Sequence, residues 1–149
     1  MRIALYKPDQ AGNVGTILRL SACLAIPVDI IEPCGFAFAD RALKRAGMDY
    51  AEIANVTRHS SWQAFEGQVE GRIVLLTTKA ASRLPEARFM AGDILLMGSE
   101  SAGAPDHVHG RADLRIRIPQ ASGTRSLNIA VAAGIALAEA VRQLDQWPK

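Results

Sequence analysis

The chain has 149 residues, of which 49% are hydrophobic, and 17 basic side chains against 15 acidic ones give a formal net charge of +2. This length suits one domain with its own core, and the apolar content excludes an intrinsically disordered chain. The N-terminal segment carries charges and Pro8 where a secretory signal needs an apolar run, and no apolar stretch reaches the roughly 18 residues of a membrane span. We therefore expect a single cytoplasmic domain over residues 1–149, and the net charge alone does not indicate a nucleic-acid partner.

Short apolar runs alternate with helical patterns along the chain. We predict strands at 3–6, 28–31, 53–56, 72–77, 94–97 and 114–118, and helices that begin near Asn13, Asp40, Ser61 and Ser126. Several of these strands are apolar on both faces, which is typical of a parallel sheet covered by helices on both sides. The predicted fold class is therefore α/β with a mostly parallel sheet. The last helix is apolar almost all the way round, so it is expected to be buried on most sides, by its own sheet or by a second subunit.

The segment 13–19 follows the first predicted strand and opens the first helix. Gly15 and Arg19 are four residues apart and share one helix face, and helical side chains lean toward the N-terminus. We therefore expect the Arg19 guanidinium near the free N–H groups of the first turn, where phosphate binds readily. The alternatives are a solvated surface arginine at 19 and a helix N-cap at Asn13.

Two further glycine-containing loops, 98–105 and 118–128, follow predicted strands. Glycine lets the backbone approach a ligand closely, and ligands of α/β sheets bind beyond the carboxyl ends of the strands. Glu100 is expected either to act as a cap or surface charge, or to hold a polar group of a substrate or cofactor. Asn128 lies in the first turn of the apolar last helix, where it either satisfies the neighbouring loop backbone or faces the site.

Two sets of basic side chains share a face. Arg41, Lys44 and Arg45 have the spacing of one helix face, and Arg115 and Arg117 share one face of a predicted strand whose other face is apolar. Either set has the arrangement to follow a phosphate backbone, and a solvated face is the alternative for each.

The three motifs N-x-G-x-x-x-R at 13–19, L-x-G-x-E-x-x-G at 96–103 and S-L-N at 126–128 resemble, in order and spacing, those of the SPOUT methyltransferases that modify ribose 2′-hydroxyls. Four further segments are similar to the TrmL (YibK) group of that class: residues 31–36, 43–50, 56–59 and 76–79. The resemblance implies methylation of the ribose of the wobble nucleotide, cytidine or modified uridine, of certain tRNAs. It also implies S-adenosylmethionine (AdoMet) as cofactor, a deep C-terminal trefoil knot and a homodimer with the site at the subunit interface.

The resemblance further implies roles for individual residues, with no metal. The residues implied to be catalytic are Arg19, Asn13, Glu100 and Asn128. Those implied to bind the cofactor are Leu76, Thr77, Gly98, Glu100, Ile118, Gln120, Ser126 and Leu127. The residues expected to bind RNA are Arg19, Arg41, Lys44, Arg45 and Arg125. Because arginine keeps its proton up to a pH above about 12, Arg19 acts either as the family's general base or as a cation that stabilises the developing alkoxide or holds a phosphate.

Two departures keep alternative functions open. Gln120 replaces a common methionine of the TrmL group, and the last motif continues as in the broader ribose methyltransferases. A second enzymatic hypothesis is therefore 2′-O-methylation of another tRNA or rRNA nucleotide, and one from a different class is a non-catalytic dimeric RNA-binding module. A nicotinamide dehydrogenase is excluded, because no G-x-G-x-x-G follows the first strand.

Overall fold

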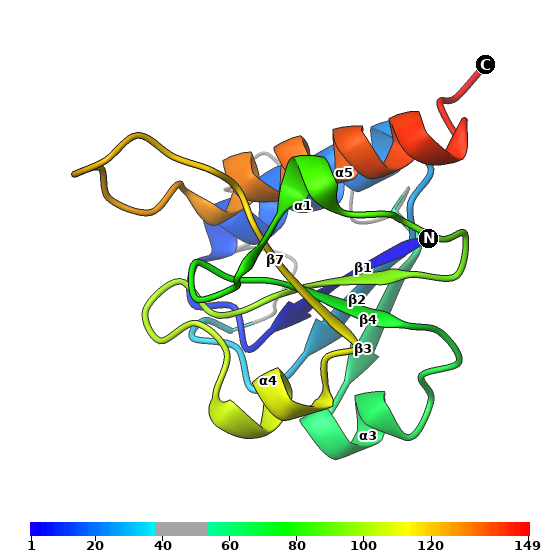
Figure 1. Cartoon of the computed structure of the whole chain (residues 1–149). Helices are drawn as coiled ribbons and strands as arrows, with labels where there is room; N and C mark the ends of the chain where they lie inside the picture. The colour runs from blue at the N-terminus through cyan, green and yellow to red at the C-terminus, as the bar shows by residue number, and fades with distance from the viewer. Residues whose placement is uncertain (38–53) are drawn as a thin grey trace.

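A seven-stranded sheet lies between two layers of helices in the computed structural model, which describes residues 1–37 and 54–149 (Figure 1). The strands are β1 (Arg2–Tyr6), β2 (Val28–Ile31), β3 (Val56–His59), β4 (Ile73–Leu76), β5 (Ser82–Arg83), β6 (Ile94–Met97) and β7 (Leu114–Arg117). Their order in the sheet is β3-β2-β1-β6-β4-β7-β5, and every neighbouring pair is parallel. The predicted α/β class with a parallel sheet is therefore confirmed.

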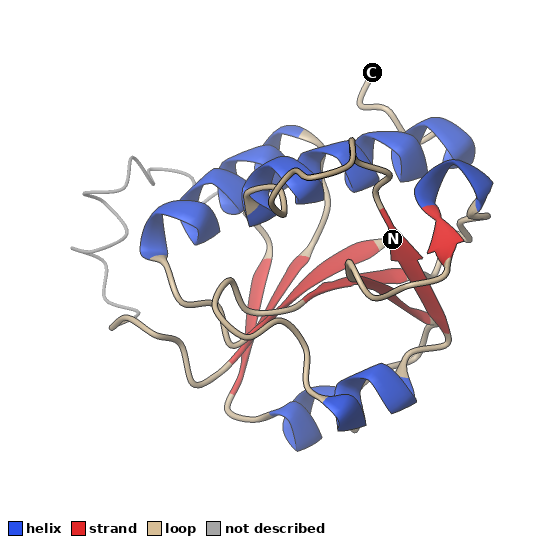
Figure 2. Ribbon diagram, turned by 60° about the vertical axis from the view of Figure 1, so that its left-hand side comes forward, coloured by secondary structure: helices blue, strands red, loops and turns tan. Residues whose placement is uncertain are grey.

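The helices cover both faces of the sheet, as the edge view in Figure 2 shows. They are α1 (Ala11–Cys23), α3 (Trp62–Glu66), α4 (Asp106–Arg111) and α5 (Ile129–Leu144), and a 3-10 turn, η1, spans Leu84–Glu86. Helices α1 and α5 pack together on one face, whereas α3 and α4 lie on the other. In the described part of the chain, no helix combines the length and the apolar character that crossing a bilayer requires.

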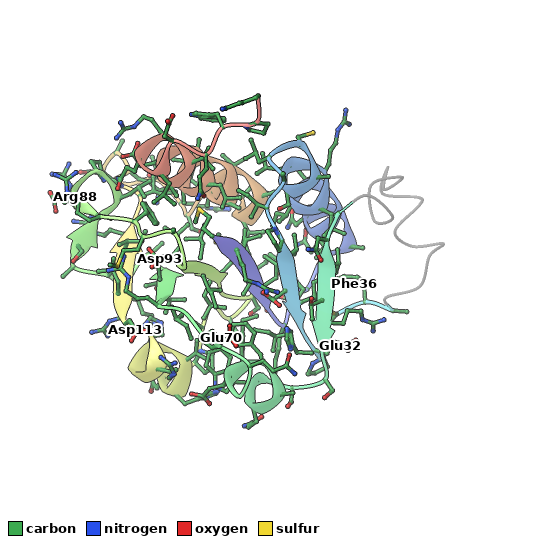
Figure 3. All side chains as sticks on the ribbon, turned by 90° about the vertical axis from the view of Figure 1, so that its right-hand side faces the viewer. Glu32, Phe36, Glu70, Arg88, Asp93 and Asp113 are labelled. Carbon is green, nitrogen blue, oxygen red and sulfur yellow. The ribbon has the colours of Figure 1, made fainter. Side chains whose placement is uncertain are left out.

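Two hydrophobic cores account for strands that are apolar on both faces. Ile3 and Leu95 are fully buried beneath α1 and α5, and Ala4 and Leu96 are fully buried beneath α3 and α4. Side chains fill the space on both sides of the sheet (Figure 3). Because β1 and β6 occupy the middle of the sheet, alternate side chains of each strand enter opposite cores, and every position of the two strands after Arg2 is buried.

The predicted strands at 28–31 and 94–97 match β2 and β6, and those at 3–6, 72–77 and 114–118 differ from β1, β4 and β7 by a residue at one or both ends. The strand predicted at 53–56 is wrong, because β3 spans Val56–His59. His59 is buried and its Nε2 lies 2.7 Å from Oδ1 of buried Asp29 on β2. A polar side chain is therefore buried at the end of an edge strand because it pairs with a carboxylate, and the search for apolar runs does not detect such a position.

The helix starts differ from prediction by two or three residues. Helix α1 begins at Ala11, before Asn13, and α5 begins at Ile129, with Asn128 rather than Ser126 as its N-cap. The start near Ser61 is confirmed, since the Ser61 hydroxyl accepts a hydrogen bond from the N–H of Ala64. The helix predicted near Asp40 lies outside the described residues.

Candidate active site

A cavity of about 460 Å³ opens where β4, β6 and β7 end, at the edge at which parallel α/β sheets bind ligands. Its volume lies within the roughly 300–1,000 Å³ of small-molecule sites. It is lined by segments from both ends of the chain, from Gln10 to Ala132. Every residue predicted to bind the cofactor lines this cavity: Leu76, Thr77, Gly98, Glu100, Ile118, Gln120, Ser126 and Leu127.

Gly98 directly follows β6, lines the cavity and leaves no room for a side chain. A Cβ at this position would lie 2.5 Å from the carbonyl carbon of Gly103 and 2.6 Å from the backbone nitrogen of Ala104. The same turn is closed by two backbone hydrogen bonds between Ser99 and Gly103, of 3.1 and 2.9 Å. Backbone atoms cannot move aside as a flexible side chain does, so this turn requires glycine at 98.

Glu100 lies in this turn and binds the segment that begins α1. One carboxylate oxygen accepts the N–H of Asp9 at 2.7 Å, and the other accepts the N–H of Gln10 at 3.3 Å and Nδ2 of Asn13 at 3.1 Å. The side chain of Gln10, the N-cap of α1, makes no capping hydrogen bond. Glu100 therefore supplies, from the turn after β6, the negative charge that a helix N-terminus favours.

Asp9, in the loop after β1, accepts hydrogen bonds from the turn that contains Glu100. Its Oδ2 accepts the N–H of Ser101 at 2.8 Å and the Ser101 hydroxyl at 2.6 Å. These two hydrogen bonds hold the pKa of Asp9 below its usual value, and the bond from the Ser101 hydroxyl has the larger effect. The loops after β1 and β6 thus each donate to the other's carboxylate. No sequence pattern identifies Asp9, because its position at a strand end gives no indication of a partner 92 residues away.

Asn13 joins this pair of loops to the last helix. Its Oδ1 accepts a hydrogen bond from Nδ2 of Asn128 at 2.9 Å. Asn128 in turn caps α5, since its Oδ1 accepts the N–H groups of Ala130 at 2.8 Å and Val131 at 3.3 Å. The N-cap role considered for Asn13 is wrong, because Asn13 is the third residue of α1. The three sequence motifs therefore meet in one hydrogen-bonded series, Glu100–Asn13–Asn128.

The predicted RNA-binding residues lie apart from the cavity wall or outside the described residues. Arg19 is exposed on α1 and is not one of the cavity-lining residues, although Gly15 on the preceding turn is buried. Arg125 is exposed in the loop before α5. Arg41, Lys44 and Arg45 belong to segment 38–53, which the structure does not describe. Within residues 1–37 and 54–149, no three His, Cys, Asp or Glu side chains are grouped as metal ligands would be.

Comparison with known proteins gives the family of the chain. The model of the SpoU rRNA Methylase family matches residues 1–138. The chain belongs to this family. The predicted resemblance to the ribose methyltransferases of the SPOUT class is thereby confirmed, and the segments that line the cavity lie within the matched region.

Individual relatives are similar over nearly the whole chain. The tRNA (cytidine(34)-2′-O)-methyltransferase of Beijerinckia indica is 51% identical over 150 residues, which cover 99% of this chain and 94% of that protein. A solved structure described as giving structural insights into the 2-OH methylation of C/U34 on tRNA is 39% identical, with a TM-score of 0.91 over 97% of this chain and 95% of that one. An AdoMet-bound rRNA methyltransferase from Sinorhizobium meliloti is 28% identical, with a TM-score of 0.85 over 96% of this chain and 56% of the other.

We predict that Gly98→Ala weakens AdoMet binding by at least about tenfold, because the added Cβ forces the turn at the cavity wall to move. Isothermal titration calorimetry measures the affinity. Gly92→Ala is the matched control, since a Cβ there meets no atom within 4 Å. Equal AdoMet affinity of the two variants would show that the turn at Gly98 does not shape the binding site.

Proposed function

We propose that this protein is an AdoMet-dependent tRNA 2′-O-methyltransferase that acts in the cytoplasm on the ribose of the wobble nucleotide, cytidine or modified uridine at position 34. The convergence of all three motifs on one cavity at the carboxyl edge of the sheet carries this proposal. The 51% identity to a tRNA (cytidine(34)-2′-O)-methyltransferase, over almost the full length of both chains, supports the nucleotide assignment. The proposal treats residues 1–149 as one methyltransferase domain, knotted in its C-terminal half as the resemblance implies.

The residues of the cavity fit AdoMet in chemistry as well as in volume. Leu76, Ile118 and Leu127 provide apolar surface for the adenine ring. Thr77, Gln120 and Ser126 provide hydroxyl and amide groups for the ribose and the amino-acid part. When bound, AdoMet supplies a methyl group on a positively charged sulfur, which is a good electrophile.

The protein must then align a ribose 2′-hydroxyl with that methyl group and ease the loss of its proton. Arg19 remains charged at neutral pH, so it stabilises the developing alkoxide or holds an adjoining phosphate. Both carboxylate oxygens of Glu100 accept hydrogen bonds, and Asn128 caps a helix, so these side chains act as positioning residues in this arrangement. Asn13 connects the two.

The proposed assembly is a homodimer that covers one side of α5. Val131 and Ile135, four residues apart on α5, are 52% and 41% exposed in the single chain, and Leu127, just before the helix, is 38% exposed. Side chains at this spacing lie on one helix face. Helix α1, which carries Arg19, packs beside α5, and this packing is compatible with a site at the subunit interface.

The decisive experiment is methyl transfer from labelled AdoMet to total tRNA from cells that lack the protein, followed by nuclease mapping of the labelled ribose. We expect label at nucleotide 34. Label elsewhere in tRNA, or in rRNA alone, would replace the wobble assignment with the second enzymatic hypothesis. Tight AdoMet binding without transfer to any RNA would favour the non-catalytic binding module.

We predict that Arg19→Ala lowers the methyl-transfer rate at saturating tRNA by about 100-fold or more, the usual effect of removing a group that stabilises developing negative charge. AdoMet affinity should change less than about twofold, because Arg19 does not line the cavity. Arg88→Ala, at an exposed arginine that does not line the cavity, is the control. A loss of AdoMet affinity with an unchanged rate per bound cofactor would refute the role assigned to Arg19.

We predict a solution mass by light scattering of twice the 16.0 kDa of the chain. The double variant Val131→Lys/Ile135→Lys should sediment as a monomer, because two charges would be buried in the interface without partners. Met90→Lys changes a 59% exposed methionine elsewhere on the surface and should leave the dimer intact. A dimer that persists in the double variant places the contact on another face.

A further inference from the structure

We propose that the side of β7 that faces away from α1 and α5 binds phosphates of the tRNA beside the methylated nucleotide. This surface consists of Arg83, Arg115, Arg117 and Lys79, and we call it the β7 basic surface. The inference rests on the proposed function, since it assumes an RNA substrate. It adds a tRNA-binding surface beside the cavity to the contacts that the RNA makes within it.

The alternation of side chains along β7 leaves Arg115 exposed and Arg117 half-buried. Ile116 is fully buried in the core beneath α1 and α5. Arg115 and Arg117, its neighbours in the chain, therefore point to the opposite side of the sheet. Arg115 is the register partner of buried Leu75 on β4, but is itself exposed, so the helices on that side do not cover it. Figure 1 shows β7 crossing above α4, with β4 behind it.

Positive charges are concentrated on this side of the strand. Arg83 on β5 and Arg117 are register partners in neighbouring parallel strands, which lie about 4.8 Å apart, so their side chains leave the sheet on the same side. Like charges in adjacent positions are unfavourable unless an opposite charge compensates them. Glu86 pairs with Arg83 at 3.1 Å.

The arginines of β7 differ from Arg83 in this respect. Among the residues that the structure describes, no carboxylate lies within ion-pair distance of Arg115 or Arg117. Asp113 lies just before β7, near α4 in Figure 3. Its Oδ2 accepts the N–H of Ile73 at 2.8 Å and also pairs with Arg111 at 3.3 Å. The surface therefore keeps an excess of positive charge, and the guanidinium fork suits phosphate oxygens.

The position of the surface matches a polynucleotide whose ribose enters the cavity. Arg117 immediately precedes Ile118, which lines the cavity. On the next strand, the N–H of Thr77, another lining residue, donates to the carbonyl of Ile116 at 2.9 Å. Lys79 also lines the cavity. A nucleic-acid strand that places one ribose in the cavity therefore has adjoining phosphates within reach of the arginines, which neither a neutral peptide nor the cofactor would use.

The test compares Arg115→Ala/Arg117→Ala with the wild type and with Arg58→Ala, a matched removal of an exposed arginine on β3, which lies at the opposite side of the sheet from β7. Filter binding of tRNA between about 50 and 200 mM salt gives the affinity and its salt dependence. We expect the double variant to bind tRNA at least about tenfold more weakly, with a salt slope reduced by about one for each phosphate that an arginine no longer neutralises. The KM for tRNA should rise, whereas the AdoMet affinity and the rate at saturating tRNA should change less than about twofold.

Arg115→Lys/Arg117→Lys keeps the charges and should retain most of the salt slope, although it loses the planar fork. If the alanine double variant also loses AdoMet affinity, the change at Arg117 has disturbed the cavity. The single variant Arg115→Ala, at the exposed position, then tests the β7 basic surface, and we expect the same rise in the KM for tRNA. Wild-type affinity and salt slope in these variants, while the wild type methylates tRNA, would overturn the β7 basic surface and leave the proposed function intact. A wild type that neither binds nor methylates tRNA would instead refute the proposed function.

Discussion

The geometry of the cavity depends on the hydrogen bonds that the Glu100 carboxylate accepts. The carboxylate receives three hydrogen bonds from residues 9–13 and so fixes the start of α1 against the turn that follows β6. Asn13 extends the series to Asn128, the cap of α5. Because α1 and α5 also pack against each other, the first turns of both helices are joined at the cavity, beside the carboxyl ends of the central strands. Binding groups distant in sequence are thereby held in place before any ligand arrives.

The residues of the cavity could be predicted from the sequence, but their contacts could not. Gly98 and Ile118 are recognisable because each follows an apolar strand, and the carboxyl ends of parallel strands share one edge. The hydrogen bonds of Asn13 span 87 and 115 residues, and no local pattern specifies such partners. Capping rules consider only side chains near the helix start. They therefore assign Asn13 the role of binding the free N–H groups of α1, which Glu100 performs from the turn after β6.

Element boundaries show a similar division between local and distant causes. Helix α4 is absent from the predicted helices, yet its N-cap Pro105 costs it no hydrogen bond, and Val108 buries a side chain there. Exposed side chains raise a different difficulty. The apolar residues of α5 and the arginines of β7 both follow regular spacings in the sequence, but their exposure depends on which neighbours cover each face of the sheet.

The mutual hydrogen bonds between the loops after β1 and β6 restrict how the site can be re-engineered. Transplanting residues 98–105 alone into another parallel sheet would deprive Glu100 of its donors. The same transplant would leave Ser101 without the Asp9 carboxylate that fixes it. The two loops therefore have to be transferred together, although the chain between them supplies most of the sheet. Directed evolution of substrate range in this scaffold would have to diversify both segments in the same library.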